Sequence, residues 1–165
     1  RRDNGGCLID VRSNRIVTDQ LSMPHSPRWH RGELWLLNSG RGELGTIDPR
    51  TGQFTARIFL PGFLRGLTFH GRYALVGLSK PRSGSFDGLA LDGELHKRDA
   101  EPRCGVHLID LEQMCVVEWL EFETGPVTEL FSVEILPDML RPIAIGLKSD
   151  EILTHISFDG GSLPR

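Results

Sequence analysis

The chain has 165 residues, of which 39% are hydrophobic and 25% are charged, a composition typical of a globular protein that buries a core. Its 19 Lys and Arg and 22 Asp and Glu give a formal net charge of -3, so no global positive field favours nucleic acid or an anionic membrane as a partner. Apolar runs such as residues 34–37 are far shorter than the roughly 20 residues that a membrane-spanning helix needs.

Targeting and cysteine content point to one compartment. The opening RRDNGG is not a secretory signal and starts on Arg1 rather than Met, so further sequence is expected upstream. Cys7, Cys104 and Cys115 are odd in number and form no CxxC spacing, which argues against a disulfide framework and a cysteine-rich zinc site. The reducing cytoplasm is therefore the expected location.

A repeat organises the chain. Residues 7–24, CLIDVRSNRIVTDQLSMP, are echoed by residues 44–61, LGTIDPRTGQFTARIFLP, with Asp10 and Asp48 at matching positions 38 residues apart. Residues 27–40 match 65–79 in the same way. A third, looser copy begins at Cys104, has Asp110 at the matching position, and is expected to continue with strands at 126–136, 143–148 and 152–158.

The repeated segments predict short antiparallel strands, because they are rich in β-branched and aromatic residues and are bounded by Gly, Pro, Asn and Asp. Asp48 is expected to cap a hairpin turn through its own side chain, with Gly52 taking a positive φ, and Ser13-Asn14 is expected to take the equivalent place in the first copy. The large apolar side chains expected to pack between sheets are Trp29, Trp35, Trp119, Phe69 and Tyr73.

A period near 38 with four strands per copy favours an all-β, β-propeller-like fold of about three four-stranded blades over a helical solenoid. Residues 1–165 are expected to form a single propeller-type domain or half-domain, with strands c and d of one blade, two full blades and a further partial blade. Propellers typically close with about 4 to 8 blades, so ring completion by a missing N-terminal half or by another chain is expected. An open sheet sandwich is the alternative fold.

Three segments carry a family resemblance: MPHSPRWHRGELWLLNSGRGELGTID, LPGFLRGLTFHGRYALVGLSKPR and EPRCGVHLIDL. They resemble a family of bacterial conserved hypothetical proteins that contain a domain of unknown function, over nearly the whole chain. The resemblance implies blades similar to YVTN and NHL propeller repeats and a chain equivalent to the C-terminal half of such proteins. It implies no activity and assigns no role to any residue.

The loops that join strand d to strand a, and strand b to strand c, emerge on one face of a propeller near its axis. Residues at those places are predicted to form a ligand site with a positive excess, for a small anionic ligand or a peptide. The predicted ligand-binding residues are His25, Asn38, Arg65, Lys80, Arg82, Arg103 and Lys148. The alternative for these loop cations is pairing with nearby carboxylates or exposure to water.

Residues 80–104 interrupt a connection that is otherwise short, and long loops of this kind are often lids or binding loops. Within them, residues 89–99 predict a short helix with Asp92 as N-cap and with Leu91 and Leu95 as apolar contacts. The segment is expected to border the site; a mobile surface insertion is the alternative.

Two other functions stay open. One is a metal-assisted hydrolase, such as a lactone hydrolase, or a lyase, with Glu129 as candidate catalytic base and with His25, Asn38 and Glu129 as weak candidate metal ligands. The other is a structural module whose strand edges recruit a partner. The sequence identifies no cofactor and does not decide whether the protein is an enzyme.

Overall fold

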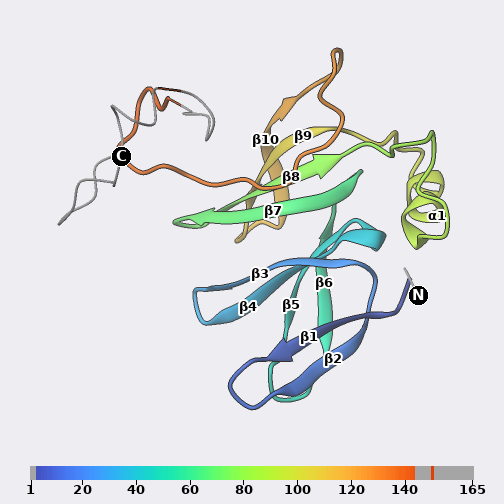
Figure 1. The fold of residues 1–165 in the computed structure, drawn as a ribbon, viewed down its shortest axis with the longest axis vertical. Helices are drawn as coiled ribbons and strands as arrows, with labels where there is room; N and C mark the ends of the chain where they lie inside the picture. The colour runs from blue at the N-terminus through green and yellow to red at the C-terminus, as the bar shows by residue number, and fades with distance from the viewer. Residues whose placement is uncertain (1–2, 144–149, 151–165) are drawn as a thin grey trace. The chain divides into compact units, whose positions relative to one another are not determined.

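The computed structural model describes residues 3–143 and residue 150 of the chain (Figure 1). The chain divides into a large unit, Arg1–Ile135, and a C-terminal unit, Leu136–Arg165. Every helix and strand described below belongs to the large unit. Among the described residues, no helix is long and apolar enough to cross a membrane.

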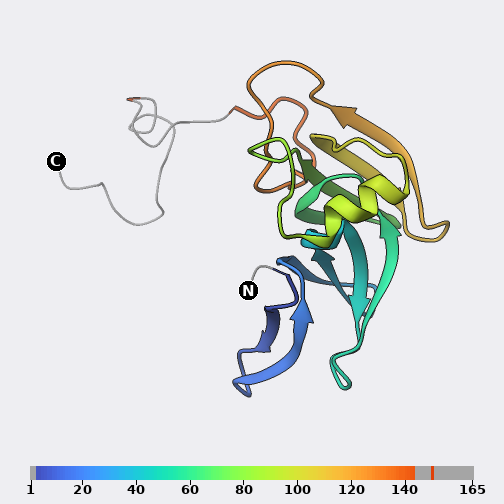
Figure 2. The same ribbon diagram turned by 90° about the vertical axis from the view of Figure 1, so that its right-hand side faces the viewer.

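The large unit is built from three antiparallel sheets, visible in Figures 1 and 2. The first sheet pairs β1 (Gly6–Asp10) with β2 (Arg15–Leu21). The second contains β3 (Pro24–His30), β4 (Glu33–Asn38), β5 (Glu43–Ile47) and β6 (Phe54–Phe59), and the third contains β7 (Phe63–His70), β8 (Tyr73–Ser79), β9 (Gly105–Asp110) and β10 (Cys115–Glu121). Neighbours in sequence are neighbours in each sheet. The all-β class is confirmed, and the sheets of two, four and four strands follow the repeat.

The matching aspartates have the same structural role in each sheet. The Oδ1 atoms of Asp10, Asp48 and Asp110 each accept a hydrogen bond from the backbone N–H two residues later, at 3.0, 2.8 and 2.9 Å. Four residues after the first two aspartates, Asn14 and Gly52 take positive φ angles of 54° and 76°, as predicted. The three turns are therefore copies of one local structure, which confirms the alignment of the repeat.

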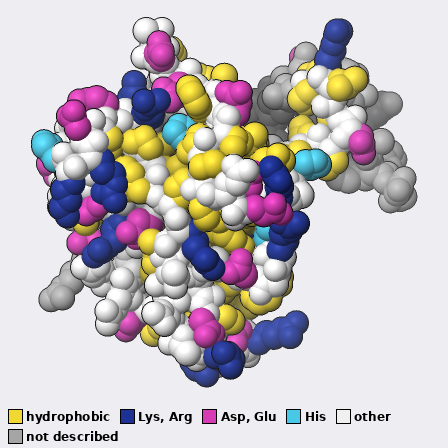
Figure 3. Space-filling view, turned by 180° about the vertical axis from the view of Figure 1, so that it is seen from behind, with side chains coloured by type: hydrophobic (Ala, Val, Ile, Leu, Met, Phe, Trp, Pro, Cys, Tyr) yellow, Lys and Arg dark blue, Asp and Glu magenta, His cyan; other side chains and the backbone are white. Residues whose placement is uncertain are grey.

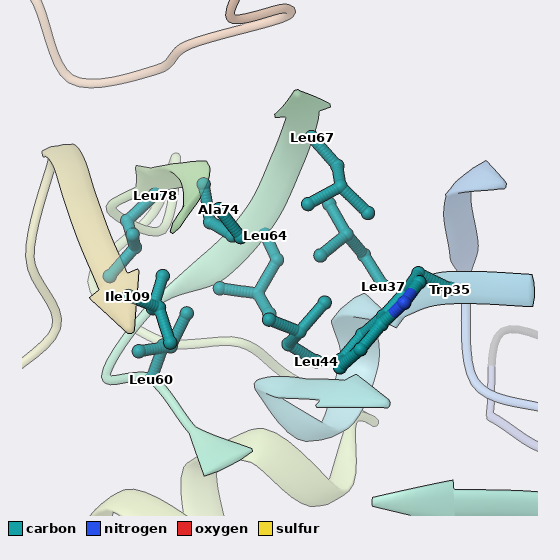
Figure 4. Close-up of a cluster of buried hydrophobic side chains, with 10 residues drawn as sticks. Trp35, Leu37, Leu44, Leu60, Leu64, Leu67, Ala74, Leu78 and Ile109 are labelled. Atoms are coloured by element: carbon teal, nitrogen blue, oxygen red, sulfur yellow. The ribbon is translucent and has the colours of Figure 1, made fainter. Parts of the chain in front are cut away.

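The main core lies between the second and third sheets (Figure 4). Strand β4 contributes Trp35 and Leu37, and β7 contributes Leu64 and Leu67, all of which are buried. On the other face of β4, Leu36 belongs to a second cluster that includes side chains of the β1–β2 hairpin. The central strands of the middle sheet, β4 and β5, are thus buried on both faces, one against each neighbouring sheet, because they carry apolar residues on both sides.

Two of the five aromatic residues expected between the sheets are instead on the surface. Trp35 is buried in the main core, and Phe69 packs against it with ring centroids 6.0 Å apart. Trp29 and Trp119, by contrast, are 64% and 57% exposed. The prediction was wrong for these two because β3 and β10 are edge strands of their sheets, so part of each strand has no neighbouring sheet over it.

The predicted strand at 126–136 is not formed: residues 122–143 contain no strand. Residues 128–133 nevertheless run beside β7 and β8. The backbone N–H of Lys80 donates to the Thr128 carbonyl at 2.9 Å, and the backbone N–H of Leu130 donates to Ser79 Oγ at 2.9 Å. The serine side chain thus takes the place of a backbone partner, which interrupts the ladder that a strand requires. The predicted strand at 152–158 and most of 143–148 lie outside the described residues.

Candidate ligand-binding site

The loops predicted to converge do lie at one end of the sheets. Pro24 at the start of β3 pairs with Asn38 at the end of β4, and Phe63 at the start of β7 pairs with Ser79 at the end of β8. The short 3-10 helix η1 (Ser39–Arg41) and residues 80–104 therefore leave the same end. The backbone N–H of Arg103 also donates to the Pro61 carbonyl at 2.8 Å, which anchors the end of the 80–104 segment beside β7.

The 80–104 segment carries helix α1 (Ala90–Lys97), within the range in which a helix was expected (Figure 2). Leu91 and Leu95 are buried in a cluster with Phe86 and Leu89. The predicted cap was wrong: Leu89 is the N-cap residue, and Asp92 lies inside the first turn. Its Oδ1 accepts a hydrogen bond from the backbone N–H of Phe86 at 2.9 Å, and a carboxylate is also stabilised there by the positive end of the helix.

A pocket of about 380 Å³ opens between this segment, the start of β7 and residue 129. Its charged lining side chains are Arg65, Lys80, Arg82, Asp87 and Glu129, and its apolar ones are Met23, Phe63, Pro81, Phe86 and Leu89. Four predicted site residues therefore meet in one pocket: Arg65, Lys80, Arg82 and Glu129. His25, Asn38 and Arg103 do not line it, and Lys148 lies outside the described residues.

Arg65 is held by aromatic rings rather than by a carboxylate. Its Cζ lies 4.9 Å from the ring centroid of Phe131 and 5.5 Å from that of Phe63. Its Nε is buried and has no hydrogen-bond partner, and none of the described carboxylates forms an ion pair with it. Stacking on aromatic faces leaves the donors at the edge of the guanidinium plane directed outward in that plane. Arg65 thus brings to the pocket a positive charge that forms no ion pair with a described carboxylate, although it acts at longer range on Glu129 and lowers its pKa.

Arg82, in contrast, is already paired. Its Nε and Nη2 donate to Oε1 and Oε2 of Glu129 at 2.6 and 2.9 Å, which is the two-point geometry that arginine and carboxylates favour. These hydrogen bonds lower the pKa of Glu129 and raise that of Arg82. A carboxylate with a lowered pKa is a weak proton acceptor. Glu129 is therefore a poor candidate for a general base while it is paired with Arg82.

His25 lies behind the pocket wall. Its Nδ1 is 2.8 Å from the Met23 carbonyl and 3.1 Å from Ser39 Oγ, and its ring meets Phe63 edge-on with centroids 5.4 Å apart. Burial lowers the pKa of His25, and the positive charge of Arg65 acts in the same direction. The neutral imidazole therefore supports Phe63, and through it the pocket wall.

Asn38 is used within the fold. It is 3% exposed; its Oδ1 accepts a hydrogen bond from the backbone N–H of Ser22 at 2.7 Å, and its Nδ2 donates to Glu43 Oε2 at 2.8 Å. Both ends of the amide are thus satisfied by the β2–β3 connection and by β5. The structure places Asn38 as a tie between these elements, away from the pocket that Arg65 lines.

Arg103 forms an ion pair with Glu121 on β10 at 2.5 Å. Beside this pair, His107 is buried with both ring nitrogens lacking a hydrogen-bond partner, and its Nε2 is 3.6 Å from Glu121 Oε1. Burial lowers the pKa of His107, although Glu121 acts in the opposite direction. Arg103 therefore has its counter-charge at the edge of the third sheet.

The three weak metal candidates do not come together. Glu129 is paired with Arg82, Asn38 with Ser22 and Glu43, and His25 with the Met23 carbonyl. Within residues 3–143, no group of three or more His, Cys, Asp and Glu side chains is arranged to hold a metal ion.

Sequence reasoning missed several pocket residues, among them Phe63, Phe86, Ser85 and Asp87. Ser85 donates a hydrogen bond to Asp87, and Phe86 stacks near Phe63 with centroids 6.4 Å apart. The signal that could have found them was the 80–104 segment itself, which was expected to border the site. Which side chains of this segment face the pocket depends on the path of the loop, and no sequence periodicity predicts that path.

The fold and the pocket define a class: an all-β domain of successive antiparallel meanders, with a pocket where one connection is lengthened. Residues 1–145 match the family described as "Domain of unknown function (DUF4915)", and the chain belongs to that family. This match confirms one part of the resemblance seen in the sequence, namely that the chain contains a domain of unknown function. Comparison with curated proteins found no match.

Proposed function

We propose that this protein is a binding domain that recognises a small anionic ligand, or the carboxylate of a peptide, in the pocket beside residues 80–104. The observation that carries the proposal is Arg65, whose guanidinium is stacked on two phenyl rings and lacks an ion-pair partner among the described residues. A partly buried charge without a counter-charge is costly, and an incoming anion would offset that cost.

Lys80 supports the same proposal. It lines the pocket with Arg65, and its backbone N–H is fixed by the Thr128 carbonyl at 2.9 Å. No described carboxylate forms an ion pair with its ammonium group. Two cations that form no ion pair with a described carboxylate therefore line one small pocket, which favours an anionic ligand over a neutral one.

The test is a titration of the purified chain with acetate, phenylacetate and phosphate at constant ionic strength, followed by calorimetry. We expect saturable binding of at least one anion and a loss of roughly 10–150-fold in affinity for Arg65→Met, the range that a hydrogen bond to a charged group supplies. Arg57→Met is the matched control, because Arg57 also lies on a strand but pairs with Glu33 at 2.9 Å outside the pocket. Equal losses in both variants would contradict the proposal.

An enzymatic role at this pocket, as a metal-assisted hydrolase or a lyase, is the weaker hypothesis. It needs Glu129 as a free base, whereas Arg82 holds both carboxylate oxygens. Hydrolysis of a lactone by the wild-type chain, abolished in Glu129→Gln, would reverse this order.

We also propose that the three sheets are successive blades of a propeller. Ser39 Oγ donates to the Leu64 carbonyl of the next repeat at 2.6 Å, and Ser79 Oγ repeats that bond one copy later, to the Leu130 carbonyl at 3.2 Å. A regular link between successive inner segments is what a radial array of blades requires.

Ring completion by another part of the protein or by a further chain is part of this proposal. The outer sheets expose apolar side chains that further blades would cover: Ile9, Val11 and Ile16 on the hairpin side and Val117, Trp119 and Leu120 on β10. Figure 3 shows hydrophobic side chains among the charged ones on one face of the molecule. A stable monomer by sedimentation, with no partner bound, would speak against completion by a second chain.

The three free thiols are consistent with the bacterial cytoplasm as the proposed location.

A further inference from the structure

We propose that the pocket selects an amphipathic monoanion, a carboxylate carried by one aromatic ring or by an aliphatic group of similar size. This inference rests on the proposed function and specifies the ligand class. It is carried by the division of the pocket lining into a cationic part and an apolar part.

The charge of the lining sets the charge of the ligand. Three cations, Arg65, Lys80 and Arg82, face two carboxylates, Asp87 and Glu129, which leaves one positive charge in excess. A single negative charge neutralises this excess. A phosphate dianion would leave the pocket with a net negative charge, and it would meet the two carboxylates at close range.

The geometry of Arg65 favours a planar anion. Its guanidinium lies against the rings of Phe63 and Phe131, so the donors that remain accessible lie in the guanidinium plane. Two parallel N–H groups in that plane match the two oxygens of a carboxylate. Lys80 adds a point charge that has no directional requirement.

The apolar side of the pocket receives the rest of the ligand. Phe63 is half-buried and stacks near Phe86, and Met23 borders them with a positive φ of 48°. A non-glycine residue in that conformation is strained and is often found in binding sites, and the soft thioether adapts to an irregular apolar surface. The volume of about 380 Å³ is at the lower end of the ~300–1,000 Å³ of small-ligand sites, which suits one ring better than an extended molecule.

The experiment compares four ligands on the wild-type chain by calorimetry: phenylacetate, acetate, phenylacetamide and inorganic phosphate. We expect phenylacetate to bind at least tenfold more tightly than each of the others, because only phenylacetate has both a single charge and a ring. Phenylacetate and acetate binding with equal affinity, or phosphate binding more tightly than phenylacetate, would overturn this inference while the proposed function survives. Binding of none of the three anions would overturn the proposed function itself.

A pair of variants tests the apolar side. Phe86→Leu keeps an apolar side chain but removes the ring from the pocket, so the preference for phenylacetate over acetate should fall severalfold while acetate affinity is unchanged. Phe69→Leu is the matched control, since Phe69 packs against Trp35 and His30 away from the pocket. An unchanged preference in Phe86→Leu, or the same fall in both variants, would contradict the assignment of the ring to this wall. The ligand series on the wild type decides the inference if either variant fails to fold.

Discussion

Asn38 and Arg65 were both predicted to bind a ligand, and the structure implies opposite responses to their removal. In Asn38→Ala, the backbone N–H of Ser22, which is fully buried, loses its only acceptor, and Glu43 loses a donor. A buried group left unsatisfied costs about 1–3 kcal/mol and a hydrogen bond to a charged group contributes about 1.5–3 kcal/mol. Because one side chain makes both interactions, we expect Asn38→Ala to lower the free energy of unfolding by ~3 kcal/mol in total.

For a chain of this length, a loss of ~3 kcal/mol lowers the melting temperature by roughly 6–12 °C. We expect that shift in a thermal melt of Asn38→Ala, with anion affinity unchanged in a titration at a temperature where the variant is folded. Arg65→Met should show the reverse pattern, with affinity lost and the melting temperature little changed. Asn38→Asp serves as a control, because it keeps the acceptor for Ser22 but places a like charge beside Glu43. A loss of affinity in Asn38→Ala equal to that in Arg65→Met would refute the structural role given to Asn38.

Three further outcomes follow from the same contacts. Glu129→Gln should raise the affinity for a monoanion severalfold in a titration, because it removes the carboxylate that pairs with Arg82 and so raises the net charge of the pocket by one; unchanged affinity would show that the pair does not compete with the ligand. The free energy of unfolding should fall as the pH drops below about 6.5, since burial lowers the pKa of His25 and His107 in the folded state. The unfolded chain then takes up protons that the folded chain does not. Denaturant melts at pH 7.5 and 5.5 measure this difference, and equal stabilities at the two pH values would contradict it. Asp110→Ala should lower the melting temperature more than Asp10→Ala or Asp48→Ala, because Asp110 is 1% exposed and pairs with Arg72 at 2.7 Å, whereas the ion pair of Asp48 with Arg50 is exposed and longer, at 3.7 Å.

The parts of the fold that depend on short-range contacts could be predicted from the sequence. The hairpin turns at Asp10 and Asp48 are set by a side chain that bonds the backbone two residues later and by a residue with positive φ. All of these interactions fall within five residues, so the local sequence determines them. The alternation of turns and apolar runs then gives the strand order of the antiparallel meanders.

The parts of the site that depend on long-range contacts could be predicted only as a group. The loop repeat placed Arg65, Lys80, Arg82 and Glu129 at one end of the sheets, where they share a pocket. Arg82 and Glu129 are 47 residues apart, and nothing local to either residue indicates that they pair. Asn38 likewise differs from a ligand-binding residue only in its tertiary contacts. The position in the repeat predicted the region of the site, whereas the tertiary packing determines which charged side chains lack an ion-pair partner.

The repeat itself explains why the pocket is formed at one place. His25 and Arg65 hold equivalent positions: each precedes an irregularity in its strand pairing, and each is followed by a residue with positive φ, Ser26 at 52° and Gly66 at 78°. The two backbones are thus alike, but the connection that follows the neighbouring strand is the short η1 in one copy and residues 80–104 in the other. Only the long connection brings Phe86 and Arg82 beside the equivalent position. The pocket therefore forms where one copy of the repeat differs from the other. Deletions that shorten residues 80–104 should remove anion binding while leaving the sheets intact.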